Sequence, residues 1–471
     1  MLRRHVTPPP RHWLQEELSG LGRLALPIAL AQAGQSLMGL VDTAVVGRAG
    51  AAPLAAVGLG NAAFFSFSVL GIGLMMGLDP LVSQAVGAGD GARARRLLWQ
   101  GGWLALGASA ALALPMALVP AALEPLGIDA AVAADAARFV WWRLPGLPFL
   151  LLFIAGRSYL QAYGRTRPML VAVVAANLAN LPAAVLLVFG GAALPAWTGP
   201  LRLVPAMGAG GAALATSIVT VLQAGILALS VRGEAGPDRA PDPTRRRPSR
   251  ADLALAARLG LPVGLHMAAE VGVFALAGFL AGRLGPVPLA AHQIALTYGS
   301  FTFNAAVGIG NAGSVRVGWA VGARDPARAR RSGLAAFGAG AAFMSLGAIA
   351  FLLFSRPLAR LMTDQPEVVA AAAPLLAVAA LFEISDGVQG VGAGVLRGAG
   401  DTRFTFVANM IGHYLVGLPV AVLLGMVLGG GVVGLWWGLC AGLTAVAVAL
   451  LLRFWRLSRR EISPVEARPG A

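Results

Sequence analysis

The sequence predicts an all-α integral membrane protein of about twelve transmembrane helices, arranged as two homologous six-helix lobes around a central cavity. Two observations support this fold class. Hydrophobic residues make up 57% of the 471 residues and charged residues only 12%, whereas about 25% of the residues in soluble domains are charged. The two halves also share a set of motifs at one fixed spacing. A soluble domain with a single anchor is excluded, because apolar runs cover nearly the whole length.

Apolar runs of about twenty or more residues, separated by charged residues, proline or glycine, define the expected spans. In the first half they lie near residues 21–46, 54–78, 97–120, 137–163, 168–192 and 207–231. In the second half they lie near residues 255–282, 289–313, 332–354, 370–396, 403–428 and 431–455. We therefore expect an N-terminal segment over 1–20, lobes over 21–231 and 253–456, a linker over 232–252 and a tail over 457–471.

Arginines cluster in the segments after the second, fourth and eighth spans, in the linker and after the last span. They are Arg93, Arg95, Arg96, Arg165, Arg167, Arg324, Arg328, Arg330, Arg331, Arg245, Arg246, Arg247, Arg456, Arg459 and Arg460. Because cytoplasmic loops carry such an excess, we expect a multi-pass protein of the bacterial inner membrane with both termini in the cytoplasm. The arginines of the linker have two interpretations. They either only reflect the cytoplasmic location of this loop or also attract anionic lipid headgroups.

Several classes of partner and cofactor are not expected. The net charge of +15 does not indicate nucleic-acid binding, because the arginines lie in short segments between apolar runs. The chain has no lysine, so it cannot form a Walker A phosphate loop, and a gradient or a partner protein must drive any transport. The single cysteine, Cys440, excludes an intrachain disulfide and a cysteine metal cluster. We expect no cofactor.

An internal repeat relates the two halves. Gly47-Arg48 followed by Pro53-Leu54-Ala55-Ala56 recurs, 235 residues later, as Gly282-Arg283 followed by Pro288-Leu289-Ala290-Ala291. Ala85-Val86-Gly87-Ala88 recurs at the same shift as Ala320-Val321-Gly322-Ala323. Six spans per repeat leave both lobes in the same orientation, related by an axis along the membrane normal. Rocking of one lobe against the other would then give alternating access to the cavity between them.

Three carboxylates inside the expected spans are the functional candidates. Asp42 lies toward the outer end of the first span, and Glu270 and Asp386 lie near the middles of the seventh and tenth spans. An intramembrane charge costs about 3 kcal/mol on insertion scales, so these three residues are the predicted cation-coupling groups. Neither Glu270 nor Asp386 has an arginine partner within its own span, so each could take a proton, a sodium ion or an organic cation in competition. A sodium ion, if bound, is expected at this pair.

Polar residues at helical spacing accompany these carboxylates. Gln35 shares a helical face with Asp42, His266 precedes Glu270 by one turn, and Gln389 follows Asp386. The predicted substrate-cavity residues are Gln35, Asn177, Asn180, Gln293, Thr297, Asn304 and Gln389. The alternative is that such groups only join helices by hydrogen bonds, and the pattern leaves it open. His266, His413 and Glu383 are assigned no role.

A set of short motifs resembles the multidrug and toxic compound extrusion (MATE) family, specifically its NorM-like branch, over roughly residues 20–455. The motifs are Val41-Asp42-Thr43 followed by Gly47, Glu270, Ala290-Ala291-His292-Gln293-Ile294-Ala295-Leu296, Arg316-Val317-Gly318, and Ser385-Asp386 through Gly394-Val395-Leu396-Arg397-Gly398. The resemblance implies a proton- or sodium-driven antiporter of cationic, often aromatic, drugs. It places Glu270 and Asp386 in the cation site of the C-terminal lobe, and Asp42 and Asn180 in the N-terminal lobe.

Two positions depart from the family pattern. Ala184 stands where many relatives carry Asn or Asp, and Phe382 stands where some carry a tyrosine one turn before the aspartate. Both departures leave the choice of coupling ion open.

We therefore expect a secondary active transporter, not an enzyme, that is a monomer in the lipid bilayer and exchanges organic cations for protons or sodium. A flippase for a lipid-linked saccharide is the main alternative, but its cavity should be basic to hold pyrophosphate. A membrane enzyme would need clustered metal ligands or a nucleophile beside its base, and no such spacing appears. A major-facilitator transporter would share the helix count but not these motifs.

Overall fold

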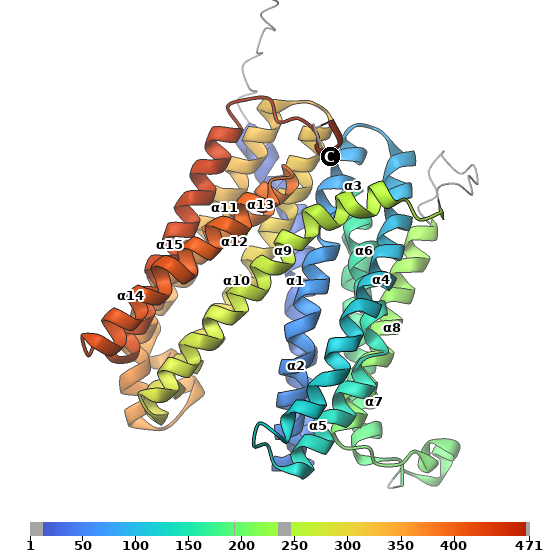
Figure 1. Cartoon of the computed structure of the whole chain (residues 1–471), viewed down its shortest axis with the longest axis vertical. Coiled ribbons are helices and arrows are strands. Elements are labelled where there is room, and N and C mark those ends of the chain that lie inside the picture. The colour runs from blue at the N-terminus through green and yellow to red at the C-terminus, as the bar shows by residue number, and fades with distance from the viewer. Residues whose placement is uncertain (1–12, 193, 234–245, 468–471) are drawn as a thin grey trace, which may run out of the picture.

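The computed structural model describes residues 13–192, 194–233 and 246–467, which form helices and turns without any strand (Figure 1). Ten of the described helices are long and apolar enough to cross a membrane, or eleven when the bent pair α5–α6 counts as one span. The remaining long helix, α10, has 37 residues and carries the polar stripe from Gln293 to Asn304. The predicted all-α membrane architecture is confirmed.

The N-terminal lobe contains eight α-helices and one short 3-10 segment. They are α1 (Trp13–Gly47), α2 (Ala51–Met75), α3 (Leu78–Gly87), α4 (Gly91–Leu123), α5 (Ala130–Arg143), α6 (Gly146–Ala162), α7 (Arg167–Phe189), η1 (Ala196–Leu203) and α8 (Ala209–Gly233). Helices α2 and α3 share the second expected span. Helices α5 and α6 share the fourth and meet at an angle of 45° beside Pro145, which cannot donate a backbone hydrogen bond.

The C-terminal lobe repeats this order. Its elements are α9 (Arg250–Arg283), α10 (Pro286–Gly322), α11 (Pro326–Met362), α12 (Pro366–Gly398), α13 (Thr402–Asn409), η3 (Met410–Gly417), α14 (Leu418–Val422), η4 (Leu423–Val427) and α15 (Gly431–Leu457), followed by a 3-10 turn, η5 (Val465–Ala467). The run from α13 to η4 is one continuous helix with two π-helical segments. It corresponds to the eleventh expected span.

The expected ends of the lobes differ from the observed helix ends by a few residues. Helix α1 begins at Trp13 rather than near residue 21, and α9 begins at Arg250, inside the expected linker. Residues 234–245 of that linker, and the outermost parts of the expected terminal segments, lie outside the described residues.

The internal repeat is visible in the backbone. Gly50 and Gly285, 235 residues apart, precede α2 and α10 with φ angles of +128° and +120°. Such angles favour glycine because it has no Cβ. At the same shift, the Asp90 and Asp325 side chains accept hydrogen bonds from the third residues of α4 and α11. Local capping therefore starts the equivalent helices of both lobes in the same way.

The two lobes converge at one end and diverge toward the other (Figure 1). The segments that join α3 to α4, α6 to α7 and α10 to α11 lie at the converged end, together with the last described residues. The arginine clusters lie in these segments and in the first two turns of the helices that follow them, so we call this the arginine-rich end. Near it, Gly73 of α2 faces Gly264 of α9 so closely that a Cβ on Gly73 would collide with the α9 backbone. Small residues allow this close helix contact.

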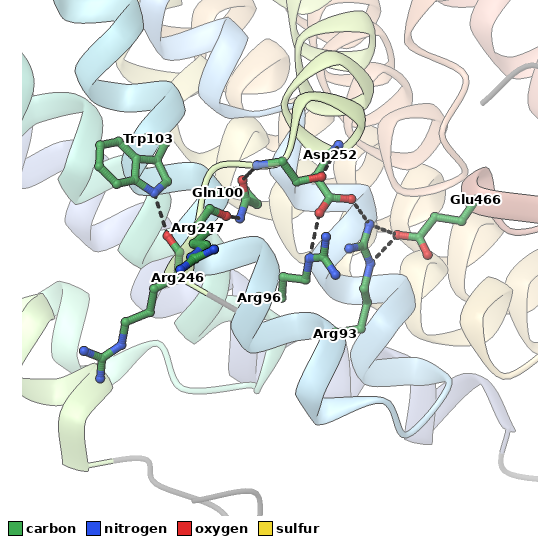
Figure 2. A network of polar contacts seen from close by, with 9 residues as sticks. Arg93, Arg96, Gln100, Trp103, Arg246, Arg247, Asp252 and Glu466 are labelled. Carbon is green, nitrogen blue, oxygen red and sulfur yellow. Dashed lines mark hydrogen bonds and ion pairs between the residues drawn. The ribbon is translucent and has the colours of Figure 1, made fainter. Parts of the chain in front are cut away.

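Polar side chains also join the lobes at the arginine-rich end (Figure 2). Arg93 and Arg96 of α4 both bind Asp252, in the first turn of α9, at 2.7 and 2.9 Å. Arg93 also binds Glu466, which follows α15, at 2.7 Å. The start of the second lobe and the C-terminal segment are thereby fixed to the N-terminal lobe.

Candidate functional site

A cavity of about 700 Å³ lies between α2 and the C-terminal lobe. Its charged lining residues are Glu270 and Asp386, and no arginine is among the described residues that line it. The remaining lining is mostly apolar and aromatic, with a few polar groups. It includes Phe65, Val69, Phe274, Phe303, Phe382, Trp436, His292, Gln293 and Ser300. The cavity therefore combines negative charge with aromatic surface.

Glu270 is held in place by a histidine one turn earlier on α9. Its Oε2 lies 3.2 Å from Nε2 of His266. The same His266 nitrogen lies 3.3 Å from Nε2 of Gln389 on α12. A single ring nitrogen either donates or accepts, so the contact it makes depends on which nitrogen of His266 carries the proton. His266, which the sequence left without a role, thus links Glu270 to a predicted cavity residue.

Asp386 has a different environment. It is buried and faces the cavity from α12, and its side chain forms no hydrogen bond or ion pair with any other described residue. The nearby charged groups that act on it electrostatically are Glu270 and Glu383, both carboxylates. Carboxylates that share a buried site are stabilised by a proton or another cation, since their charges otherwise repel. The pair Glu270–Asp386 is accordingly arranged to take up positive charge.

Aromatic rings form one wall of this site. The ring centroids of Phe382 and Trp436 are 5.3 Å apart, and those of Phe274 and Phe382 are 6.0 Å apart. The indole nitrogen of Trp436 donates to Nδ1 of His292 at 3.1 Å, which fixes the indole ring. The negative face of an aromatic ring attracts organic cations. Phe382 supplies such a face without the hydroxyl that a tyrosine would add.

Asp42 belongs to a separate cluster inside the N-terminal lobe. It accepts hydrogen bonds from Nδ2 of Asn180 on α7 at 2.6 Å and from Oγ1 of Thr216 on α8 at 2.7 Å. The half-buried Arg143 acts on Asp42 electrostatically. Asp42 and Asn180 were predicted from the sequence, whereas Thr216 was missed. A lone threonine in an apolar span carries no signal until its acceptor is known.

Six of the seven predicted cavity residues do not line the cavity, and Gln293 is the exception among them. Asn180 binds Asp42, and Gln389 contacts His266, as described above. Gln35 contacts Gln223 at 3.4 Å, and Asn177 donates to the Gly34 carbonyl at 2.9 Å, so both join helices of one lobe. Asn304 of α10 contacts Ser36 of α1 at 3.4 Å, across the two lobes. Thr297 is exposed and donates to its own helix backbone. Of the polar stripe on α10, only Gln293 and Ser300 line the cavity.

Two further ionisable groups lie close to the site without lining the cavity. Glu383 is fully buried on α12 and accepts a hydrogen bond from Thr302 of α10. His413 is buried in η3, has no hydrogen-bond partner among the described residues, and acts on Glu270 electrostatically. The described residues contain no group of three or more histidine, cysteine or acidic side chains placed to hold a metal ion.

Comparison with known proteins gives consistent matches along the chain. The MatE family model matches residues 27–186 and 262–423. "Probable multidrug resistance protein NorM" of Pseudomonas putida is 38% identical over 456 residues, which cover 94% of this chain and 95% of that protein. "Multidrug resistance protein MdtK" of Proteus mirabilis is 32% identical over 457 residues, which cover 94% of this chain and 96% of that protein.

Solved structures share the fold at lower identity. The eukaryotic MATE transporter AtDTX14 has a TM-score of 0.81 and 21% identity over 96% of this chain and 100% of its own. A MOP superfamily transporter from Pyrococcus furiosus, for which a reverse polarity of the binding pocket suggests a different function, has a TM-score of 0.82 and 19% identity, with 96% and 100% covered. These likenesses show that the chain shares their fold.

Proposed function

This chain belongs to the MatE family of non-enzymatic transporters, and from that premise we propose that it is a secondary active multidrug efflux transporter. It exchanges cationic organic compounds for protons or sodium ions by rocker-type alternating access. Relatives named as multidrug resistance proteins over nearly the whole chain support the multidrug part of this proposal.

One observation supports the inference that the substrates are cations. Glu270 and Asp386 line the same aromatic cavity, and neither is paired with an arginine among the described residues. A coupling ion and an organic cation would compete for these two carboxylates. Binding of the ion then releases the drug, and reopening to the other side reloads it, so the two fluxes are coupled without chemistry.

The N-terminal cluster has a supporting part in this proposal. Asp42, with Asn180 and Thr216, is a second place where a proton or cation could bind inside a lobe. For sodium, carboxylate oxygens of Glu270 and Asp386 are the expected ligands, since hard cations prefer oxygen. Gln293 and Gln389 supply amide groups beside them.

We place the arginine-rich end in the cytoplasm of a bacterial cell, with both termini on that side of the inner membrane. The diverging ends of the lobes then face outward (Figure 1). The transporter works as a monomer, because each chain carries both lobes and a complete cavity.

A flippase for a lipid-linked saccharide would be built on the same fold. Its cavity should offer positive charge to a pyrophosphate group, whereas the charged residues of this cavity are Glu270 and Asp386. The polarity of the site favours an organic cation.

The proposal is tested by drug efflux in an efflux-deficient bacterial host. Expression of the protein should lower ethidium accumulation, and Asp386→Asn should abolish this effect by removing one of the two carboxylates from the cavity. Glu367→Gln is the matched control, because Glu367 is exposed in the first turn of the same helix. Full efflux by Asp386→Asn at equal expression would refute the assigned coupling site.

The coupling ion is identified separately. Vesicles that contain the purified protein are given a pH gradient without sodium, or a sodium gradient at equal pH, and ethidium transport is followed in each. Transport under one gradient identifies the ion, and transport under neither refutes antiport.

A further inference from the structure

A second cavity, of about 420 Å³, lies within the N-terminal lobe between α4, α6 and α8. Most of its lining is apolar, with Leu98, Phe149 and Val221 among the residues that face it. Exposed apolar side chains surround it on α4 and α8. They include Trp99, Trp103, Leu106, Ile218, Leu222 and Leu229. This cavity therefore opens on the lipid-facing surface, away from the cavity between the lobes, and we call it the α4–α8 groove.

Positive charge gathers at one end of the α4–α8 groove. Arg95, in the second turn of α4, and Arg232, in the last turn of α8, both line it, and no acidic residue lines it among the described residues. The start of α4 and the end of α8 lie toward the arginine-rich end (Figure 1). A groove with apolar walls and a cationic end is complementary to a lipid whose headgroup is anionic.

The end of the linker adds a third cation beside the groove. The guanidinium of Arg246 lies over the Trp99 ring, 5.1 Å from its centroid. The backbone carbonyl of Arg246 accepts a hydrogen bond from Trp103 at 2.8 Å, which fixes this segment to α4. In Figure 2 the Arg246 side chain points away from the Asp252 network. Its charge is not used to join the lobes.

We propose that the α4–α8 groove binds one anionic phospholipid of the cytoplasmic leaflet. An acyl chain lies against the apolar residues between α4, α6 and α8, and the phosphate lies near Arg95, Arg232 and Arg246. Guanidinium groups suit this ligand because their planar donors match phosphate oxygens. Trp99 lines the groove beside Arg95, and tryptophan is enriched at membrane interfaces.

Lipid binding to the purified full-length protein is measured by native mass spectrometry, with phosphatidylglycerol and phosphatidylcholine of identical acyl chains. Phosphatidylglycerol should bind at least fivefold more tightly than phosphatidylcholine. The triple variant Arg95→Gln/Arg232→Gln/Arg246→Gln should lose this preference. The control variant Arg324→Gln/Arg456→Gln/Arg460→Gln removes the same amount of charge at the same end of the protein. It should keep the preference for phosphatidylglycerol.

A second variant separates the groove from general surface charge. Gly225 lines the groove, and a Cβ added there would meet nothing within 4 Å, so Gly225→Phe is the variant chosen to fill the space. This variant keeps every arginine but should also lose the phosphatidylglycerol preference. Retention of the preference by Gly225→Phe, or equal loss in the control variant, would overturn the proposal. The readout is binding alone and does not depend on the proposed transport.

Discussion

Asp79 of α3 and Arg397 of α12 form a buried ion pair between the two lobes, with 3.1 Å from Oδ2 of Asp79 to Nε of Arg397. Ser158 of α6 donates to the other oxygen of Asp79, and Arg397 donates to Asn311 of α10 at 2.6 Å. Both charged residues are at most 8% exposed. Because α3 and α12 belong to different lobes, this ion pair stabilises their contact near the arginine-rich end.

Asp79→Asn should shift the protein away from the conformation described here. Removing one partner of a buried ion pair costs about 3–5 kcal/mol, because the other charge stays buried without compensation. The shift is measured by spin-label distances between Arg48→Cys and Arg283→Cys, two exposed positions related by the repeat, in a Cys440→Ala background. We expect the distance between the diverging ends to shorten.

The control for this experiment is Asp135→Asn. Asp135 pairs with the exposed Arg138 at 3.1 Å within one helix, and exposed pairs contribute about 0.2–1 kcal/mol. It should leave the distance distribution unchanged. An unchanged distribution in Asp79→Asn would show that the Asp79–Arg397 pair does not hold the lobes together.

The two-lobed fold could be predicted because its signals, the apolar runs and the constant spacing between the repeated motifs of the two halves, can be read directly from the sequence. Glu270 and Asp386 could be found for the same reason, since a carboxylate in a long apolar run is costly wherever its helix packs. The Asp79–Arg397 pair could not be found. Its partners are far apart in the chain, and only the packing of α3 against α12 brings them together.

The polar stripe of α10 shows a second limit of sequence patterns. Gln293, Thr297 and Asn304 share one helical face, but α10 lies in the lobe interface so that Gln293 faces the cavity and Asn304 contacts α1. The spacing shows which side chains share a face of the helix, but it does not show which helix or cavity each of them contacts. Such a stripe therefore predicts polar contact without identifying a cavity.

Thr216→Val should weaken transport through its effect on Asp42. The substitution keeps the side-chain shape but removes one of the two hydrogen bonds to the carboxylate, each worth about 1.5–3 kcal/mol when the acceptor is charged. We expect a severalfold fall in the initial rate of ethidium efflux from preloaded cells, with recovery in Thr216→Ser.

Thr220→Val is the matched control for that change. Thr220 lies one turn further along α8 and donates only to the backbone carbonyl of Thr216. Loss of the Thr220 hydroxyl should leave the efflux rate within about twofold of wild type, because no charged group loses a hydrogen-bond donor. Equal effects of Thr216→Val and Thr220→Val would indicate a packing defect in α8 and not a role for Asp42.

Asp252→Asn should lower thermal stability more than Glu466→Gln. Asp252 binds two arginines and its side chain is only 9% exposed, whereas Glu466 binds one and is 45% exposed. Solvent screens the exposed pair, which contributes about 0.2–1 kcal/mol. Unfolding temperatures of the purified variants in detergent should follow the order wild type, Glu466→Gln, Asp252→Asn. The reverse order would show that the C-terminal segment, and not the start of α9, provides the main tie to α4.

Glu383→Gln should retain efflux, in contrast to Asp386→Asn on the same helix. Glu383 lies outside the cavity lining, and its contact with Thr302 can be kept by an amide of the same shape. A buried group that keeps its hydrogen bond needs no charge for stability, so ethidium efflux should stay within about twofold of wild type. Thr302→Val would instead leave the Glu383 carboxyl without its donor and should lower the unfolding temperature. If Glu383→Gln abolished efflux at normal expression and stability, the coupling site would extend to a third carboxylate, and Glu383 would join Glu270 and Asp386 in binding the cation.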